Sequence, residues 1–295
     1  MIIIQTPLRI SFSGGGTDFP DYYKKDREGY VVNAAIDKFV FVIVMRRYDN
    51  KIYVNYSRKE IVDHVDEIQH ELVREAMKLT GVTDGVEITI LADIPSSGTG
   101  LGSSGSFTVG LLNAFHIYQG EQVEPGQLAE EACEVEIRRC GRPVGKQDQY
   151  IAAFGGLSAF RFRQDDGVEM ERLTLTDREL RRLSSNFFLF YSNQTRKADD
   201  ILSEQKAQIP ENLEALNEIR SLAFDTREAL QNGDFNRLGT IINRNWELKK
   251  TLASGINNDT IDHMHASAMR GGAVGAKVCG AGGGDRKSTR LNSSH

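Results

Sequence analysis

The first half of the chain carries several stretches in which apolar and polar residues alternate or β-branched residues cluster. Such patterns predict strands, because successive side chains of a strand face opposite sides of a sheet. They occur at 2–12, 30–46, 51–56, 86–91 and 157–163. Residues 60–79 instead place apolar side chains near helical spacing, and helices are also predicted at 107–118 and 127–139.

The second half of the chain has a different pattern. A strand pair is predicted at 167–175 and 186–192. The amphipathic segments that follow predict helices at 198–208, 212–232, 234–252 and 258–270. Trp246 shares a helical stripe with apolar neighbours and is interpreted as a core residue. The change of pattern predicts two domains with a boundary between 165 and 185.

Composition limits the partners and the compartment. The 295 residues, 40% hydrophobic and 26% charged, are typical of a globular protein with one large or two ordinary domains. A net charge of −5 with interspersed acids and bases gives no electrostatic footprint for nucleic acid or an anionic membrane. The N-terminus lacks signal-peptide features, and the three cysteines lack metal or redox spacing, so a cytoplasmic protein is expected.

A glycine- and serine-rich loop at 94–106 lies between a predicted strand and a predicted helix. Glycines let successive N–H groups turn toward one point, and the helix adds unpaired N–H groups and the positive end of its dipole. Such a loop suits phosphate, and its hydroxyls could bind phosphate oxygens or Mg²⁺. The candidate nucleotide-binding residues are Pro95, Gly98, Gly100, Leu101, Gly102, Ser103, Ser104, Gly105 and Ser106. A glycine-rich turn with a serine N-cap is the alternative.

Two known phosphate loops can be compared with this one. A Walker A loop needs a lysine, and none occurs between Asp84 and Tyr118. Residues 100–105 do match the Gly-x-Gly-x-x-Gly dinucleotide fingerprint, so a dinucleotide-binding oxidoreductase is an alternative. The context disagrees, because the helix leads into the polar, proline- and glycine-broken segment 119–126 and not into a second strand.

The end of the first predicted strand is a second candidate site. Arg9 shares one face of that strand with two serines. The residues after the strand are Gly14, Gly15, Gly16, Thr17 and Asp18. Glycines there let the backbone approach a ligand closely beside a carboxylate. A flexible turn closed by Asp18 as a cap is the alternative.

Two acids in the middle of the chain carry candidate chemistry. Glu136 lies at the margin of an apolar helical stripe, where an acid is either a partly buried salt bridge or a metal ligand. Asp148 follows a proline- and glycine-containing turn that also carries Arg142 and Lys146. Nearby cations favour a carboxylate that can orient a hydroxyl group or accept its proton. A helix N-cap is the alternative for Asp148.

A second glycine-rich segment, 271–284, surrounds a short predicted strand. Two such segments in one chain suggest that the backbone packs against a ligand or against the other loop. His263 and His265 lie two positions apart on the preceding helix and point in different directions. They cannot chelate one metal well, so both are interpreted as surface residues.

Three motifs in this order resemble those of the GHMP small-molecule kinases: 7–9 leading into 14–18, the loop 95–106, and 277–284. The resemblance implies an α+β fold, with a ribosomal protein S5 domain 2-like ATP-binding domain at 1–170 and a ferredoxin-like C-terminal domain at 171–284. It also implies ATP and Mg²⁺ as cofactors and a small sugar or sugar phosphate as substrate.

The same resemblance assigns roles to individual residues. Asp148 is similar to the family's catalytic aspartate, and Glu136 stands where the family has its magnesium-binding glutamate. This favours the metal-ligand interpretation of Glu136, with Ser104 as a second ligand. The nucleotide phosphates would rest on the backbone of 98–106, and Arg9 would stabilise both Asp148 and the phosphoryl group in transfer.

The resemblance also bears on the substrate. Galactokinases carry Gly-Glu-His-Thr-Asp where this chain has three glycines, a threonine and Asp18, so space opens where the far end of the sugar would lie. The pattern most resembles kinases that convert D-glycero-D-manno-heptose 7-phosphate to the 1,7-bisphosphate at the anomeric hydroxyl. Arg196 is a candidate for the extra phosphate, with a solvated surface position as the alternative, and Gly280 and Gly282 are further candidate substrate residues.

The last residues, 285–295, are polar and break the pattern. The family continues into another apolar strand there, so this segment resembles a non-native tail on a truncated gene, and an incomplete C-terminal sheet is expected. A galactokinase- or fucokinase-type enzyme and a non-catalytic relative that binds ATP or sugar are the alternatives to a heptose kinase.

Overall fold

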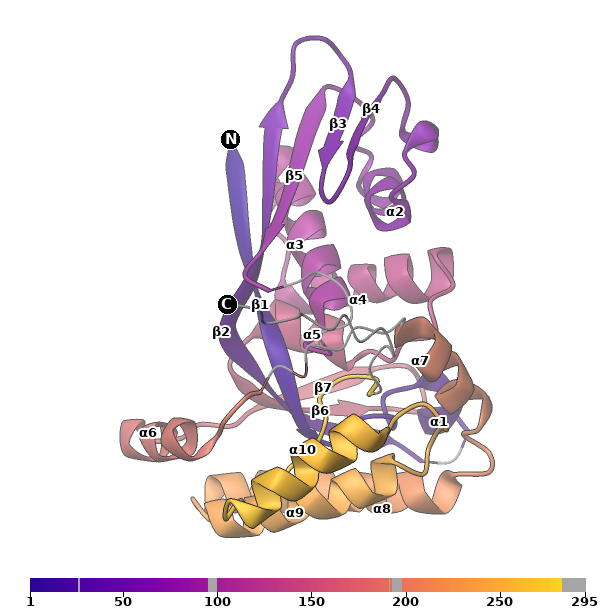
Figure 1. Cartoon of the computed structure of the whole chain (residues 1–295). Helices are drawn as coiled ribbons and strands as arrows, with labels where there is room; N and C mark the ends of the chain where they lie inside the picture. Colours follow the sequence, from indigo (N-terminus) through magenta and orange to yellow (C-terminus); the bar gives the residue numbers. More distant parts are fainter. Residues whose placement is uncertain (26, 95–99, 191, 193–197, 283–295) are drawn as a thin grey trace, which may run out of the picture.

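The computed structural model describes residues 1–25, 27–94, 100–190, 192 and 198–282. Its centre is a mixed sheet of seven strands (Figure 1). The strands are β1 Ile2–Ser13, β2 Gly29–Arg46, β3 Ile52–Asn55, β4 Lys59–Val62, β5 Val86–Ala92, β6 Leu157–Phe162 and β7 Val168–Arg172. The strands predicted before residue 175 are thereby confirmed. The order is β4-β3-β5-β2-β6-β7, with β1 paired to β2.

The long strand β2 organises this sheet. One of its edges pairs antiparallel with β1 over nearly the whole length of both strands. On the other edge, its C-terminal half pairs with β5 and its N-terminal half with β6. Arg9 on β1 pairs with Ala35, opposite the gap between these two partners, and a register shift separates Arg9 from Pro7. Such irregularities re-aim side chains, and this one lies at the candidate site.

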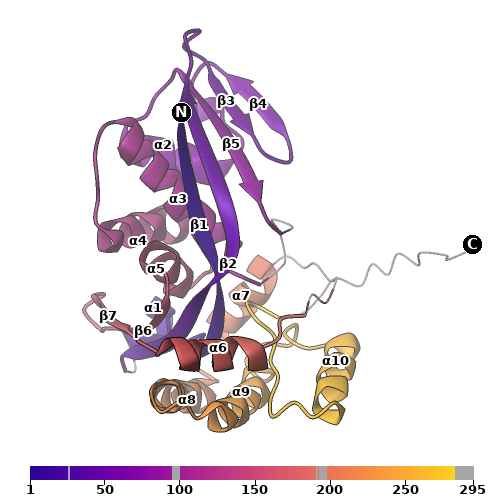
Figure 2. The ribbon, with the colours of Figure 1, turned by 90° about the vertical axis from the view of Figure 1, so that its left-hand side faces the viewer.

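Four helices cover one face of the sheet (Figure 2). They are α2 Glu71–Thr80, α3 Ser103–Tyr118, α4 Pro125–Cys133 and α5 Gln147–Phe154. Helix α3 is buried along most of its length and packs on β1 and β2. Helix α4 continues directly into a π-helical turn, η2 Glu134–Arg139, so the helix predicted at 127–139 changes its winding where Glu136 lies.

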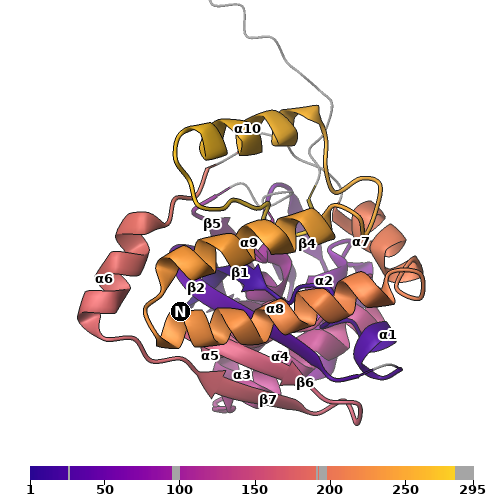
Figure 3. The ribbon, with the colours of Figure 1, turned by 90° about the horizontal axis from the view of Figure 1, so that it is seen from below.

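After β7, the regular structure of the described chain is helical. It contains α6 Asp177–Asn186, α7 Ala198–Ala207, α8 Leu213–Gln231, α9 Phe235–Lys249 and α10 Asp259–Arg270. Helices α8 and α9 lie side by side beneath the sheet, and α8 contacts β1 and β2 (Figure 3). Trp246 on α9 is fully buried, which confirms its interpretation as a core residue. The same core contains Tyr22 and Tyr23 of the short helix α1 Pro20–Tyr23. Within the described ranges, no helix is long and apolar enough to cross a bilayer.

The helix predicted over 60–79 was wrong at its start. Residues 59–62 form β4, paired with β3, and a short 3-10 turn, η1 Val65–Glu67, follows before α2 begins. The Glu60 carboxylate accepts the N–H groups of Gln69 and His70, at 2.6 and 3.1 Å. These bonds satisfy donors just ahead of α2 and fix the helix start at Glu71.

Two further strand predictions fail in the described residues. The strand predicted at 186–192 and the short strand predicted within 271–284 are absent where the structure describes these segments, and no described strand pairs with either one. A strand needs such a partner for its backbone hydrogen bonds. Phe187 packs edge-on against Phe12, whereas Phe188 and Phe190 are exposed. Helix α6, which was not predicted, begins in a capping box between Thr176 and Glu179.

Candidate active site

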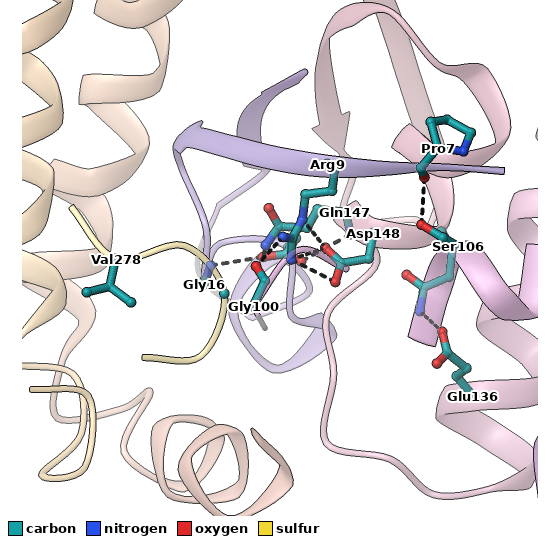
Figure 4. Close-up of polar contacts among 12 residues, drawn as sticks. Pro7, Arg9, Gly16, Gly100, Ser106, Glu136, Gln147, Asp148 and Val278 are labelled. Carbon is teal, nitrogen blue, oxygen red and sulfur yellow. Dashed lines mark hydrogen bonds and ion pairs between the residues drawn. The ribbon is translucent and has the colours of Figure 1, made fainter. Parts of the chain in front are cut away.

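An ion pair joins β1 to α5 at the centre of the candidate site (Figure 4). Arg9 donates from Nε and Nη2 to the two carboxylate oxygens of Asp148, at 2.7 and 2.8 Å, and from Nη1 to the Gly100 carbonyl at 2.7 Å. The arginine is buried, and the two-point contact fixes the plane of the carboxylate. The N-cap of α5 is Lys146, so the alternative that Asp148 caps this helix is wrong.

The described part of the first glycine loop packs against this ion pair. A Cβ added to Gly102 would lie 3.3 Å from the Asp148 carboxylate, and one on Gly105 would lie 2.9 Å from the Asp148 Cβ. Gly102 also has a φ of +76°, which favours glycine. The Ser106 hydroxyl donates to the Pro7 carbonyl at 2.7 Å and ties α3 to β1. The amino end of α3 therefore reaches the catalytic candidate, as a phosphate site requires.

Not all of the predicted loop can be compared with the structure. Pro95 and Gly98, and Arg196 from the second half, lie outside the described residues. Gly100, Leu101, Gly102 and Ser103 through Ser106 are described. Leu101 is buried, and its carbonyl accepts the N–H of Arg9 at 3.0 Å.

Glu136 is buried on the π-helical turn, close to the amino end of α3. Its carboxylate accepts hydrogen bonds from the Ser104 hydroxyl and the Gln149 amide. Arg142 donates to the Ser104 hydroxyl at 2.8 Å and lies 4.0 Å from the carboxylate. Burial raises the pKa of Glu136 to about 7, although Ser104 and Arg142 act in the opposite direction.

These residues fit a magnesium ion only in part. The Ser104 hydroxyl and the Glu136 carboxylate are adjacent oxygen donors of the kind that Mg²⁺ prefers. Among the described residues, no group of three His, Cys, Asp or Glu side chains could hold a metal. The remaining positions would therefore fall to water and to the oxygens of a bound phosphate, as is usual for Mg²⁺. The salt-bridge alternative is also partly met, since Arg142 stands at 4.0 Å.

The turn 14–18 is tightly bound into the fold. The buried Asp18 accepts the N–H groups of Gly16, at 2.9 Å, and Gln147, at 3.1 Å. The bond to Gly16 closes the turn itself, and the bond to Gln147 satisfies the first N–H group of α5, far along the chain. Burial raises the pKa of Asp18. The Thr17 hydroxyl donates to the Gly14 carbonyl at 2.8 Å. The turn therefore holds α5, and Asp148 with it, in position.

The three glycines of this turn differ in their surroundings. Gly14 and Gly16 have φ values of +91° and +104°, and a Cβ on either would clash with its neighbours. A Cβ on Gly15 would lie 3.3 Å from the Gln147 amide nitrogen and 3.7 Å from the Ser11 hydroxyl oxygen, both of which are side-chain atoms. Gly15 is thus the position of the turn that could take a larger residue at the smallest structural cost.

The two glycine-rich segments contact each other. A Cβ on Gly280 would lie 2.3 Å from the Gly100 Cα, and one on Gly100 would lie 2.3 Å from the Cys279 carbonyl oxygen. Gly282 packs on the Ile256 backbone in the same way. The interpretation that one loop packs against the other is confirmed. Only residues without a Cβ allow this approach, which brings the second loop to the Arg9–Asp148 pair.

Sequence reasoning assigned no role to two lysines, one at the end of α9 and one within the second glycine-rich segment. Lys249 donates to the carbonyls of Val278 and Gly280, and Lys277 donates to the carbonyl of Phe12. A usable signal was present for Lys249, because it lies three positions after Trp246 on α9 and so falls at the edge of the buried stripe of that helix.

Comparisons with known proteins find matches in both halves of the chain. The family model described as GHMP kinases N terminal domain matches residues 56–156, and that described as GHMP kinases C terminal matches 226–285. The D-glycero-alpha-D-manno-heptose 7-phosphate kinase of Campylobacter jejuni is 31% identical, over 95% of this chain and 86% of its own. The L-fucokinase/L-fucose-1-P guanylyltransferase of Bacteroides fragilis is 27% identical, over 95% of this chain and 33% of that protein.

The fold has solved counterparts as well. The crystal structure of a D-glycero-D-manno-heptose 1-phosphate kinase from Bacteroides thetaiotaomicron superimposes with a TM-score of 0.79 at 25% identity, covering 96% of this chain and 86% of that one. The predicted two-domain α+β fold is confirmed by this likeness and by the two domain matches. With both family domains matched in order and a relative 31% identical over most of both chains, the chain belongs to the GHMP kinase family.

Proposed function

We propose that this kinase transfers the terminal phosphoryl group of ATP to the anomeric hydroxyl of D-glycero-D-manno-heptose 7-phosphate, which gives the 1,7-bisphosphate. The names of two similar proteins, both heptose phosphate kinases, support the class of acceptor. The observation that carries the reaction is the two-point Arg9–Asp148 pair set against the amino end of α3.

ATP would place its phosphates against the backbone of 100–106. The positive end of the α3 helix dipole favours negative charge there. Ser104 and Glu136 would hold the Mg²⁺ that accompanies the nucleotide. When bound, the metal supplies positive charge that offsets the charge developing on the phosphoryl oxygens.

Asp148 is the proposed base of the reaction. The sugar oxygen forms a bond to the terminal phosphorus, the bond from that phosphorus to the bridging oxygen of ATP breaks, and the hydroxyl proton moves to an Asp148 oxygen. Arg9 holds the carboxylate plane through two hydrogen bonds and adds positive charge beside the transfer. Positioning and electrostatics supply most of the rate enhancement in this chemistry.

The acceptor would lie against the turn 14–18, with Gly280 and Gly282 on its other side. Asp18 is buried and its oxygens are already bonded to backbone N–H groups, so we assign it mainly to holding the turn. We place the far end of a sugar longer than galactose beside Gly15, where only side-chain atoms of Gln147 and Ser11 lie within reach of an added Cβ. Arg196 stays a proposed contact of the far phosphate.

An ADP-release screen tests this assignment. Heptose 7-phosphate, galactose, fucose and mevalonate are compared as acceptors, with Asp148→Asn as the matched inactive control. We expect the highest kcat/KM with heptose 7-phosphate and Mg²⁺-dependent turnover that the variant lacks. A higher kcat/KM with fucose or galactose would replace the proposed substrate, and ATP binding without turnover on any acceptor would favour a non-catalytic relative.

A further inference from the structure

Lys249, the last residue of α9, has no role in the reaction proposed above. Its ammonium group donates to the Val278 carbonyl at 3.4 Å and to the Gly280 carbonyl. A lysine carries three such hydrogens, and these two bonds use two of them. Figure 4 shows the segment that carries Val278 beside Gly16 and Gly100. Gly280 of this segment contacts Gly100, so the Lys249 ammonium is bound to backbone that borders the site.

Lys277 is bound in a similar way, to groups on β1 and α9. Its ammonium donates to the Phe12 carbonyl at 3.1 Å and to the Asn245 side-chain oxygen at 3.3 Å. All the acceptors of both lysines are neutral. Both lysines are half-buried, and in the part of the chain that the structure describes no carboxylate pairs with either ammonium group.

The surroundings of the two lysines carry excess positive charge. Burial lowers the pKa of Lys249 to about 7, and the charge of Lys277 adds to this effect. Burial also lowers the pKa of Lys277 to about 8, with Arg9 acting in the same direction. Cys279 acts in the opposite direction on the pKa of both lysines. Asp148 also raises the pKa of Lys249, less strongly, and Arg9 already occupies both Asp148 oxygens. Such a site is expected to bind an anion.

The lysines are coupled to the phosphate loop through backbone. Lys249 holds the Gly280 carbonyl, and Gly280 contacts Gly100 without room for a Cβ on either residue. Gly100 in turn accepts a hydrogen bond from Arg9. One short chain of contacts therefore links Lys249 to the site of phosphoryl transfer.

We propose that Lys249 and Lys277 form a cationic wall that binds a terminal phosphate group in the active site. The third hydrogen of Lys249 is the donor, and Lys277 acts through its charge. The proposal rests on the proposed kinase function. The phosphate is either the terminal group of ATP or the one carried by the sugar, and the chemistry required of the lysines is the same for both.

The wild-type protein provides the first test. A bound phosphate dianion favours the charged form of Lys249, so at pH 8 binding should take up on the order of 0.5–1 proton per ligand. Calorimetry of Mg²⁺-ATP and of heptose 7-phosphate, in buffers with different ionisation enthalpies, counts this proton directly. The measurement needs no variant and no turnover.

The second test uses Lys249→Met, with Lys250→Met as the matched control. Lys250 is the next residue and pairs with Glu247 on the same helix. Removal of a charge-assisted hydrogen bond should weaken binding roughly 10- to 100-fold. The ligands are compared in pairs, ATP with ADP and heptose 7-phosphate with the unphosphorylated heptose. Thermal melts confirm that both variants are folded.

The pattern of losses decides the source of the phosphate. If Lys249→Met loses affinity for ATP but not for ADP, the two lysines bind the terminal phosphate of the nucleotide. If it loses affinity for the sugar phosphate but not for the free sugar, they bind the phosphate of the acceptor. Wild-type affinities in Lys249→Met, an equal loss in Lys250→Met, or no proton uptake by the wild type would overturn the proposal. If Lys249→Met loses affinity only for phosphorylated ligands and the wild type turns over no acceptor, the proposed reaction is refuted. The proposed phosphate-binding role of the two lysines is then retained.

Discussion

The substitution Gly105→Ala tests how closely α3 must approach the proposed base. A Cβ at residue 105 would lie 2.9 Å from the Asp148 Cβ and 3.1 Å from the Gln149 backbone nitrogen. Ordinary contact begins at 3.4 Å, so α3 and α5 would have to separate by about 0.5 Å, the difference between 3.4 and 2.9 Å. The nearest atoms belong to the backbone and Cβ of α5 and cannot rotate away.

The expected magnitudes follow from this displacement. Overpacking a close-packed interior costs about 1–3 kcal/mol in the free energy of unfolding. Misplacing a reacting group by about 1 Å can cost about 10²-fold in rate, so half that displacement should lower kcat by about 10-fold. Urea denaturation and steady-state ADP release measure the two effects separately.

Gly126→Ala is the matched control for this substitution. Gly126 is also a helical glycine, on α4, and a Cβ there would meet only the Phe154 ring, at 3.9 Å. We expect unchanged kcat and a gain of up to about 1 kcal/mol in stability, because alanine favours helix over glycine. Wild-type kcat in Gly105→Ala, or an equal loss of kcat in both variants, would refute the reasoning.

Three further predictions concern turnover, specificity and pH. Asp148→Asn should bind ATP normally by calorimetry but lose about 10²-fold or more in turnover, since an amide accepts no proton; near-normal turnover would remove Asp148 from its role. Gly15→Glu should lower kcat/KM for heptose 7-phosphate selectively, and an unchanged value would contradict our placement of the far end of the sugar. Burial alone would raise the pKa of Asp166, but hydrogen bonds from Lys146 and Tyr23 outweigh it and hold the pKa below its usual range. Because the folded pKa is lowered, the stabilisation is present above about pH 4 and is lost as pH falls. Asp166→Asn should therefore cost about 1 kcal/mol at pH 7 and much less near pH 2 in chemical denaturation, and a pH-independent difference would contradict this.

The fold could be predicted from sequence where the local pattern decides the structure. Strand alternation correctly gave β1, β2 and β5, and apolar spacing gave α8 and α9. Prediction failed where pairing with a residue distant in sequence decides the secondary structure. Residues 59–62 have a spacing that also fits a helix, but pairing with β3 makes them a strand.

The candidate site shows the same division. Glycine-rich segments and isolated acids were visible in sequence, and the structure brings Arg9, Gly102 and Asp148 together. Sequence could not show that the Asp18 carboxylate is already used as a cap, since that depends on where α5 begins. It also could not show the ammonium of Lys249 behind Gly280, because their meeting depends on how α9 packs against the second glycine loop.

A crystal structure with a non-hydrolysable ATP analogue and Mg²⁺ is the measurement that bears most directly on the central claim. We predict that the terminal phosphate contacts the backbone N–H groups of 100–106, with the metal on Ser104 and Glu136 and the Asp148 carboxylate facing the phosphorus. A nucleotide bound elsewhere, or one whose terminal phosphate points away from Asp148, would contradict the account.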